Sequence, residues 1–186
     1  MERRVSLIVV TDPRYGDARI LEVARACSSV DGFAMQLRDR TERTDEDLLP
    51  LARELRAIVP MLIVNRRVDL ARRVRADGIH GEELPADFAW RSSPAHDAKQ
   101  LQNARNAGAN AALVSPIFAS PGKGAPRGVS ALREARAMAP DMTIVALGGI
   151  DETNARACRE AGADAVAVIR AIFESRDPAA LAMRLL

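Results

Sequence analysis

The segment from Met35 to Arg40 alternates apolar and polar side chains in a pattern suited to binding an anion. An extended chain turns successive side chains to opposite faces, so Gln36, Arg38 and Arg40 share one face. Two guanidinium groups that point into a protein are costly to desolvate unless an anion meets them. The pattern therefore predicts a site for a phosphorylated ligand. The alternative is a solvated rim on which Arg38 pairs with a neighbouring acid.

A second group of polar residues follows a short apolar run at 62–64. Asn65 comes directly after this run, which places its amide at the end of a buried segment. Arg66 and Arg67 add positive charge at the same point. We interpret Asn65 and Arg66 as candidate binding residues. For Arg67, the pattern favours a place on the solvated start of the next helix.

His80 is followed closely by two carboxylates, Glu82 and Glu83. A histidine beside carboxylates is suited to acid–base chemistry or to metal binding. One histidine with adjacent glutamates is too little to indicate zinc. Loop carboxylates are also commonly just solvated, and this alternative stays open.

The segment 115–128 is rich in glycine and proline and contains Ser120 and Lys123. A loop of this composition can wrap a phosphate, because its backbone N–H groups approach closely and the ammonium supplies charge. An ordinary surface loop has the same composition. The spacing alone does not decide between the two.

The pair Gly148-Gly149 follows another apolar run and gives the strongest indication of a binding site. Glycines leave backbone N–H groups open to a ligand, and a helix is expected to begin shortly after them. We therefore interpret Gly148 and Gly149 as a phosphate cradle rather than only a tight turn. Arg170 follows the last apolar run and is expected at the same rim.

Short apolar runs alternate with amphipathic segments along the whole chain. Candidate strands are 6–11, 33–37, 61–65, 77–80, 89–92, 111–115, 143–147 and 165–169, and candidate helices are 17–27, 44–58, 68–74, 97–107, 128–138, 152–161 and 178–186. This alternation predicts a parallel α/β sheet, and eight strands favour a (β/α)8 TIM barrel. The stretch 81–87 is too short for a normal helix, so the fourth crossover is degenerate. We expect residues 1–186 to form a single domain with shortened loops, whose polar strand ends gather at one rim.

Composition excludes several classes of function. The 186 residues carry a net charge of +2, which gives no electrostatic basis for binding nucleic acid or an anionic membrane. The two cysteines, Cys27 and Cys158, lie in helical patterns and are expected to be buried thiols in a reducing compartment. The first apolar run is too short for a signal peptide, so we expect a cytoplasmic protein. The oligomeric state, a homo-oligomer included, stays open.

These segments together resemble the thiamine phosphate synthase and thiazole tautomerase superfamily. The residues and motifs that carry the resemblance occur in order as Val9, Thr11 and Asp12, Gln36-Leu37-Arg38-Asp39-Arg40, Asn65-Arg66-Arg67-Val68-Asp69-Leu70-Ala71, Asp77-Gly78-Ile79-His80, His96, Gly108-Ala109-Asn110, Ser115-Pro116-Ile117-Phe118, Lys123, Ala146-Leu147-Gly148-Gly149-Ile150 and Gly162-Ala163-Asp164-Ala165-Val166-Ala167-Val168. The resemblance implies a transferase of thiamine biosynthesis that joins an aminopyrimidine diphosphate to a thiazole phosphate and releases pyrophosphate. The pyrimidine and thiazole phosphates would be its small-molecule partners.

The resemblance also assigns roles to residues. Arg38, Arg40 and Lys123 would serve the diphosphate, with Arg40 replacing the usual lysine. The pyrimidine would contact Gln36 and Asn65, and Ser120 would supply a loop hydroxyl. Gly148 and Gly149 would bind the thiazole phosphate, and Arg170 stands where a serine is usual.

Magnesium is doubtful as a cofactor, because Arg66 stands where the synthases usually carry the aspartate that binds it. Glu82 or Glu83 would then be the remaining metal ligands. Two arginines, Arg66 and Arg170, could instead neutralise the diphosphate.

The related tautomerases also lack that aspartate, but their catalytic histidine is here Pro116, so His80 or His96 would have to replace it. A thiazole tautomerase and a non-catalytic phosphate-binding barrel therefore remain alternatives to the synthase.

Overall fold

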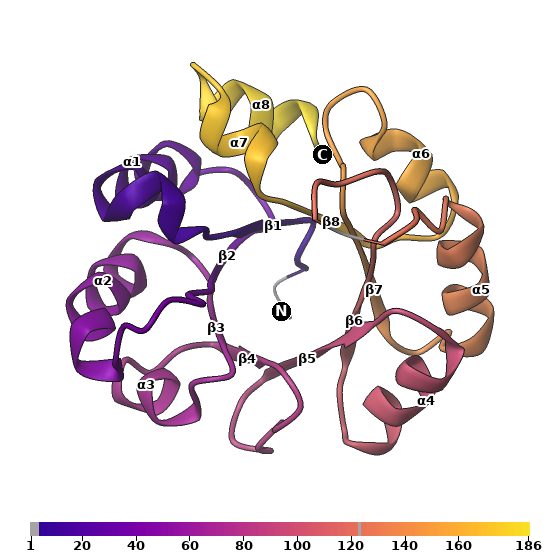
Figure 1. Ribbon diagram of the computed structural model, residues 1–186, viewed down its shortest axis with the longest axis horizontal. Helices are drawn as coiled ribbons and strands as arrows, with labels where there is room; N and C mark the ends of the chain where they lie inside the picture. The colour runs from indigo at the N-terminus through magenta and orange to yellow at the C-terminus, as the bar shows by residue number, and fades with distance from the viewer. Residues whose placement is uncertain (1–3, 123) are drawn as a thin grey trace.

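The chain forms a closed barrel of eight parallel strands in the order β1 to β8, with β8 pairing β1 (Figure 1). The computed structural model describes residues 4–122 and 124–186. The strands are β1 (Leu7–Val10), β2 (Phe33–Leu37), β3 (Leu62–Asn65), β4 (Gly78–His80), β5 (Trp90–Ala95), β6 (Ala111–Val114), β7 (Thr143–Leu147) and β8 (Ala165–Val168). The TIM barrel predicted from the sequence is confirmed.

Helices surround the barrel on its outer face (Figure 1). They are η1 (Pro13–Tyr15), α1 (Gly16–Cys27), α2 (Asp45–Ile58), α3 (Val68–Arg73), α4 (Ala98–Asn106), α5 (Ser130–Met138), α6 (Ala155–Glu160), α7 (Arg170–Glu174) and α8 (Pro178–Arg184). The crossover between β4 and β5 contains no helix, as expected. In the described part of the chain, no helix is both long and apolar enough to cross a membrane.

The strands have two apolar faces. Alternate residues such as Ile8, Ala34, Ile63 and Val145 fill the barrel interior, whereas residues such as Met35 pack outward against the helices. Gln36 lies two residues beyond Ala34 and therefore points into the barrel, above the apolar layer. The interior is thus filled by packed side chains below, and Gln36 is one of the polar residues near the carboxyl ends of the strands.

Hydrogen bonds at the start of α2 hold the end of the loop that follows β2, which carries Arg38 and Arg40. Thr44 begins α2 with a capping box, in which its side chain and that of Asp47 each accept from the other's backbone N–H. Arg67 donates to Asp45 at 2.6 Å and to the backbone oxygen of Arg43 at 2.7 Å. Arg67 is therefore structural, in line with its expected place at a helix start.

Three elements, α6, β5 and α7, differ most from the prediction. Helix α6 begins at Ala155 rather than at residue 152, because Asp151 accepts from Thr153 and binds Asn154 in a preceding turn. Strand β5 runs to Ala95 rather than stopping at residue 92. The short α7 was not predicted, because five residues are too few to show helical periodicity.

Candidate functional site

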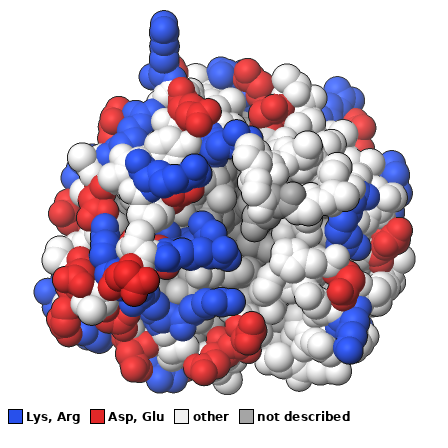
Figure 2. Space-filling model, viewed as in Figure 1, with Lys and Arg blue, Asp and Glu red and all other residues white. Residues whose placement is uncertain are grey.

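The end of the barrel formed by the carboxyl ends of the strands has a positively charged half and a nearly uncharged half. Figure 2 shows blue side chains along the left of a central hollow, over β1 to β4, and few charges beside the hollow over β6 to β8. The sequence explains this difference, because arginines follow β2 and β3, whereas glycines follow β7. We call the first side the cationic half and the second the glycine half.

Gln36, Arg38 and Arg40 extend from β2 into the cationic half. The side chain of Gln36 is only 2% exposed, and its Oε1 has no hydrogen-bond partner among the described residues. A buried acceptor left without a partner is costly, so this oxygen is available to a ligand donor. Neither Arg38 nor Arg40 forms an ion pair within residues 4–122 and 124–186. The predicted grouping of these three residues is therefore present.

The backbone of Arg38 is held by Thr11 from the neighbouring strand. The Thr11 hydroxyl accepts from the Arg38 N–H at 2.8 Å and donates to the Arg38 carbonyl at 2.9 Å. Thr11 is 1% exposed, so water does not compete for these bonds. This role of Thr11 was not predictable from the sequence, because no pattern within either segment reveals a contact between the two.

The charge around Arg38 is mostly positive. Burial and then repulsion from Arg40 lower the pKa of the Arg38 guanidinium, with Asp12 as the opposing acid. Asp12 is itself engaged, because both of its oxygens accept from Arg14 at 2.7 to 3.1 Å. Those bonds lower the pKa of Asp12. The cationic half therefore keeps a surplus of positive charge.

Asn65, Arg66 and His80 bring β3 and β4 into the same half. Asn65 pairs with His80 in the strand register, and its amide donates to the His80 carbonyl at 3.4 Å. The Arg66 N–H donates to the same carbonyl at 2.8 Å, with Arg66 at φ 63°. Arg66 Nη2 lies 3.8 Å from Glu82 Oε1. The structure thus brings Asn65 and Arg66 next to the β2 residues.

His80 is buried and neutral at pH 7. Burial, followed by repulsion from Arg66, lowers the pKa of His80 to about 4. Its Nδ1 lies 3.0 Å from the hydroxyl of Ser92, a fully buried residue of β5. Ser92 was not among the predicted site residues, although its position two residues after Trp90 on one strand face was the available signal. His96 lies elsewhere at the rim, where its Nδ1 is 2.8 Å from the Ser115 carbonyl.

On the glycine half, the loop after β6 packs directly on Gly148 and Gly149. A Cβ at Gly148 would lie 2.9 Å from Pro116 Cα, and one at Gly149 would lie 2.6 Å from the Ala119 oxygen. Both glycines have positive φ, at 106° and 64°. Among the described residues, no acceptor binds the N–H of either glycine. Glycine is therefore needed for packing, and the two N–H groups remain available to an anion.

The remaining predicted residues lie around this half. Ser120 is half-buried and directly follows Ala119. Arg170 is exposed at the start of α7. Lys123 lies outside the described residues, so its predicted role stays a prediction. Because α6 begins after an intervening turn and has only six residues, it does not add the helix N-terminus expected beside Gly149.

The residues present do not fit a magnesium site. Mg²⁺ prefers carboxylate and other oxygen ligands in octahedral geometry. Glu82 and Glu83 are both exposed, and Glu82 forms an ion pair with the guanidinium of Arg66. Within the described ranges, no three His, Cys, Asp or Glu side chains gather to hold a metal ion. The surplus of arginines would also repel a divalent cation.

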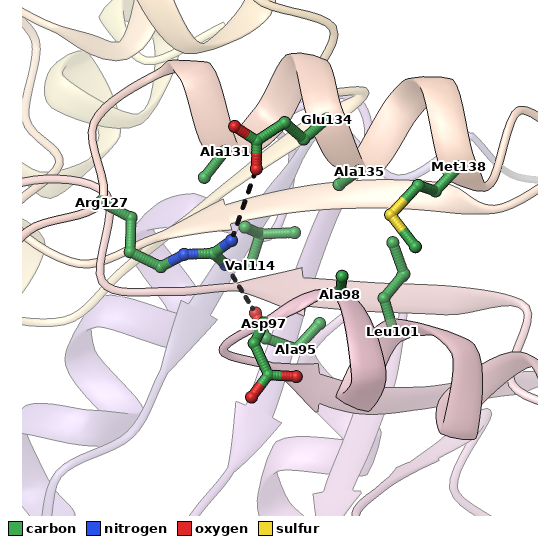
Figure 3. Close-up of a pocket in the computed structure, with 10 residues that line it drawn as sticks. All are labelled: Ala95, Asp97, Ala98, Leu101, Val114, Arg127, Ala131, Glu134, Ala135 and Met138. Atoms are coloured by element: carbon green, nitrogen blue, oxygen red, sulfur yellow. Dashed lines mark hydrogen bonds and ion pairs between the residues drawn. The ribbon is translucent and has the colours of Figure 1, made fainter.

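A small pocket lies outside the barrel, between α4 and α5 (Figure 3). Arg127 crosses it, donating to the Ala95 carbonyl at 3.4 Å and lying 4.0 Å from Glu134. Leu101 and Met138 line its other end. Its lining includes none of the predicted site residues, so we do not connect it with the rim.

Comparisons with known proteins identify the family of this chain. A family model described as thiamine monophosphate synthase matches residues 7–172. A thiamine-phosphate synthase of Methanoregula boonei is 38% identical, with 96% of this chain and 90% of the relative covered, and one of Roseiflexus castenholzii is 37% identical, with 92% and 82% covered. The fold is similar to that of a thiamine phosphate pyrophosphorylase from Pyrococcus furiosus, with a TM-score of 0.82, 23% identity and coverage of 98% and 94%. The chain therefore belongs to the thiamine monophosphate synthase family.

Proposed function

We propose that this enzyme is a transferase that joins an aminopyrimidine diphosphate to a thiazole phosphate, forming thiamine phosphate and pyrophosphate. The C–O bond between the pyrimidine methylene and the diphosphate breaks, and its electron pair leaves with the oxygen. The thiazole nitrogen then supplies the pair for the new C–N bond. The observation that carries the proposal is the division of the rim into a cationic half and a glycine half, which provides separate places for two phosphorylated substrates.

The cationic half suits the diphosphate. Negative charge grows on the departing diphosphate as the C–O bond lengthens, and fixed cations stabilise that charge more in the transition state than in the bound substrate. This role for Arg38 and Arg40 is supported by their free charges, since no carboxylate among the described residues pairs with them. Thr11 fixes the Arg38 backbone before the substrate binds. Lys123 is included in the proposal from the sequence alone.

Gln36 and Asn65 suit the pyrimidine ring. The unpartnered Oε1 of Gln36 is a hydrogen-bond acceptor inside the rim, and the exocyclic amino group of an aminopyrimidine is a matching donor. Because a buried acceptor strongly favours a ligand that can donate to it, this contact would orient the ring and select for it.

The glycine half suits the thiazole phosphate. The N–H groups of Gly148 and Gly149 have no acceptor among the described residues, and backbone N–H groups in left-handed turns bind phosphate oxygens. Ser120 and Arg170 stand at the edge of this half. The cytoplasmic location belongs to the same proposal and is supported by two buried, unpaired thiols.

Formation of thiamine phosphate from both substrates, by purified protein, tests this function. The reaction is run with excess Mg²⁺ and separately with EDTA, so that metal dependence does not decide the result. We expect product in at least one condition and a loss of at least about tenfold in Arg38→Ala. Folded protein that forms no product in either condition would contradict the proposal.

A further inference from the structure

The cationic half holds more positive charge than its own acids can neutralise. The guanidinium group of Arg38 is repelled there by those of Arg40, Arg14 and Arg66. Both carboxylate oxygens of Asp12 accept hydrogen bonds from the guanidinium of Arg14. Arg38 and Arg40 have no ion-pair partner among the described residues. Guanidinium groups gathered in this way bind a diphosphate strongly, because each can donate two parallel hydrogen bonds.

The backbone directs Arg66 toward this set. Arg66 has a φ of 63°, which is uncommon for a residue other than glycine. Its backbone N–H donates to the His80 carbonyl. Gly81 directly follows His80, the last residue of β4, and a Cβ at Gly81 would lie 3.3 Å from Arg66 Cγ. The absence of a side chain at Gly81 thus leaves room for the stem of Arg66 across the end of β4.

Glu82 is the only acid that pairs with Arg66 among the described residues, and the pairing is loose. The two side chains are 68% and 85% exposed, and their charged atoms are 3.8 Å apart. Exposed pairs of this kind contribute little and are easily exchanged. Glu82 is therefore placed as a counter-ion that an arriving diphosphate can displace.

We propose that the guanidinium of Arg66, together with those of Arg38 and Arg40, neutralises the diphosphate directly, so that this enzyme binds its diphosphate substrate and releases pyrophosphate without a divalent cation. This inference rests on the proposed function. In it, Arg66 supplies a fixed positive charge where a metal ion would otherwise be needed, and Glu82 is a competitor of the ligand and not a metal ligand.

Calorimetry with inorganic pyrophosphate tests the inference without requiring turnover. Wild type, Arg66→Gln, Glu82→Gln and Arg75→Gln are titrated in EDTA and again in excess Mg²⁺. Arg75 is the matched control, because it is an exposed arginine that also has a positive φ, of 52°, but lies between α3 and β4 at the other end of the barrel.

We expect wild type and Arg75→Gln to bind pyrophosphate equally well in EDTA, with no tighter binding in Mg²⁺. Arg66→Gln should bind about tenfold more weakly in EDTA, as expected for the loss of one charged contact. Glu82→Gln should bind as tightly as wild type or more tightly, since it removes the competing anion. If Glu82 were a metal ligand, Glu82→Gln would instead weaken the binding of pyrophosphate in Mg²⁺.

The inference is overturned if wild type binds pyrophosphate only in Mg²⁺, or if Glu82→Gln weakens binding there. It is also overturned if Arg66→Gln binds like wild type in EDTA. These results are independent of the synthesis assay. Pyrophosphate binding in EDTA without product in any condition would contradict the proposed function and support the charge assignment, whereas product confined to Mg²⁺ would do the reverse.

Discussion

The hydroxyl of Thr11 bonds both the N–H and the carbonyl of Arg38, at 2.8 and 2.9 Å. One side chain at the end of β1 thereby satisfies two backbone groups just beyond the end of β2. The pairing stiffens the point from which the Arg38 guanidinium enters the rim. Catalysis by charge stabilisation depends on such fixed placement, because a mobile cation must be ordered during the reaction.

Replacing Thr11 tests this role. Thr11→Val keeps the shape but leaves two backbone groups unpaired, so the free energy of unfolding should fall by about 1–3 kcal/mol. We also expect kcat/KM for the diphosphate substrate to fall about tenfold, because Arg38 loses its fixed position. Thr11→Ser keeps the hydroxyl and should recover most of both losses. Urea unfolding followed by the fluorescence of Trp90, the only tryptophan, measures the first effect.

Gln36 should distinguish the pyrimidine from the diphosphate. Gln36→Met removes the unpartnered acceptor and keeps the volume, so stability should stay the same or rise by about 1 kcal/mol. The KM for the aminopyrimidine diphosphate should rise about tenfold. The affinity for pyrophosphate, measured by calorimetry, should not change. Equal losses for both ligands would show that Gln36 does not contact the ring.

His80 should make the protein sensitive to acid. Because its pKa is about 4 when folded and 6.5 when free, the unfolded chain binds a proton between these values that the folded chain does not. The free energy of unfolding should therefore fall as pH drops from about 6.5 to 4, by up to about 3 kcal/mol, and this contribution is fully present above 6.5. When the free energy of unfolding is measured with urea across this pH range, it should depend less steeply on pH in His80→Gln than in wild type.

Gly149 should be required for packing as well as for binding. Gly149→Ala places a methyl group 2.6 Å from the Ala119 oxygen at a φ of 64°, so we expect a loss of about 1–3 kcal/mol of stability. The loop after β6 should also become easier to cleave by protease. Gly108→Ala is the matched control, because Gly108 has a φ of 83° but nothing within 4 Å of an added Cβ. If both variants lost a similar amount of stability, the positive φ would explain the loss and the contact with the Ala119 oxygen would not.

The two cysteines should be unreactive in the folded protein. Burial raises the pKa of Cys27 and of Cys158 to about 11, and the thiolate is the reactive form. We expect an aromatic disulfide reagent at pH 8 to label neither thiol in native protein and both in urea. Labelling of one thiol in native protein would contradict its burial.

The barrel could be predicted from the sequence because the pattern of strands and helices is visible within single segments of the chain. Apolar runs of strand length alternate with helical periodicity, and glycines or polar residues mark the ends. Contacts between strands were not predictable in this way. The bonds of Thr11 to Arg38 and of His80 to Ser92 depend on register, which is set by the packing of the closed sheet and not by either segment. The delayed start of α6 was missed because the side chains of Asp151 and Asn154 favour a turn over the expected first helical residues.

For the candidate site, the sequence likewise predicted which residues gather at the rim, but not the contacts between distant segments. Gln36, Arg38, Asn65 and Arg66 meet on adjacent strand ends because parallel strands bring their carboxyl ends to one rim. The sequence could not show that Gly148 and Gly149 are also required by the loop after β6, since that approach joins segments about thirty residues apart. Nor could it show that Glu82 faces Arg66.

The division of the rim into side-chain cations and backbone donors affects how the enzyme can change during evolution. On the cationic half, a single substitution adds or removes one charge, so preference for the first substrate can shift in small steps. On the glycine half, the donors belong to the main chain, and any side chain added there collides with the loop after β6. Variation among descendants of this enzyme should therefore concentrate at the ends of β2 and β3 and spare the turn after β7.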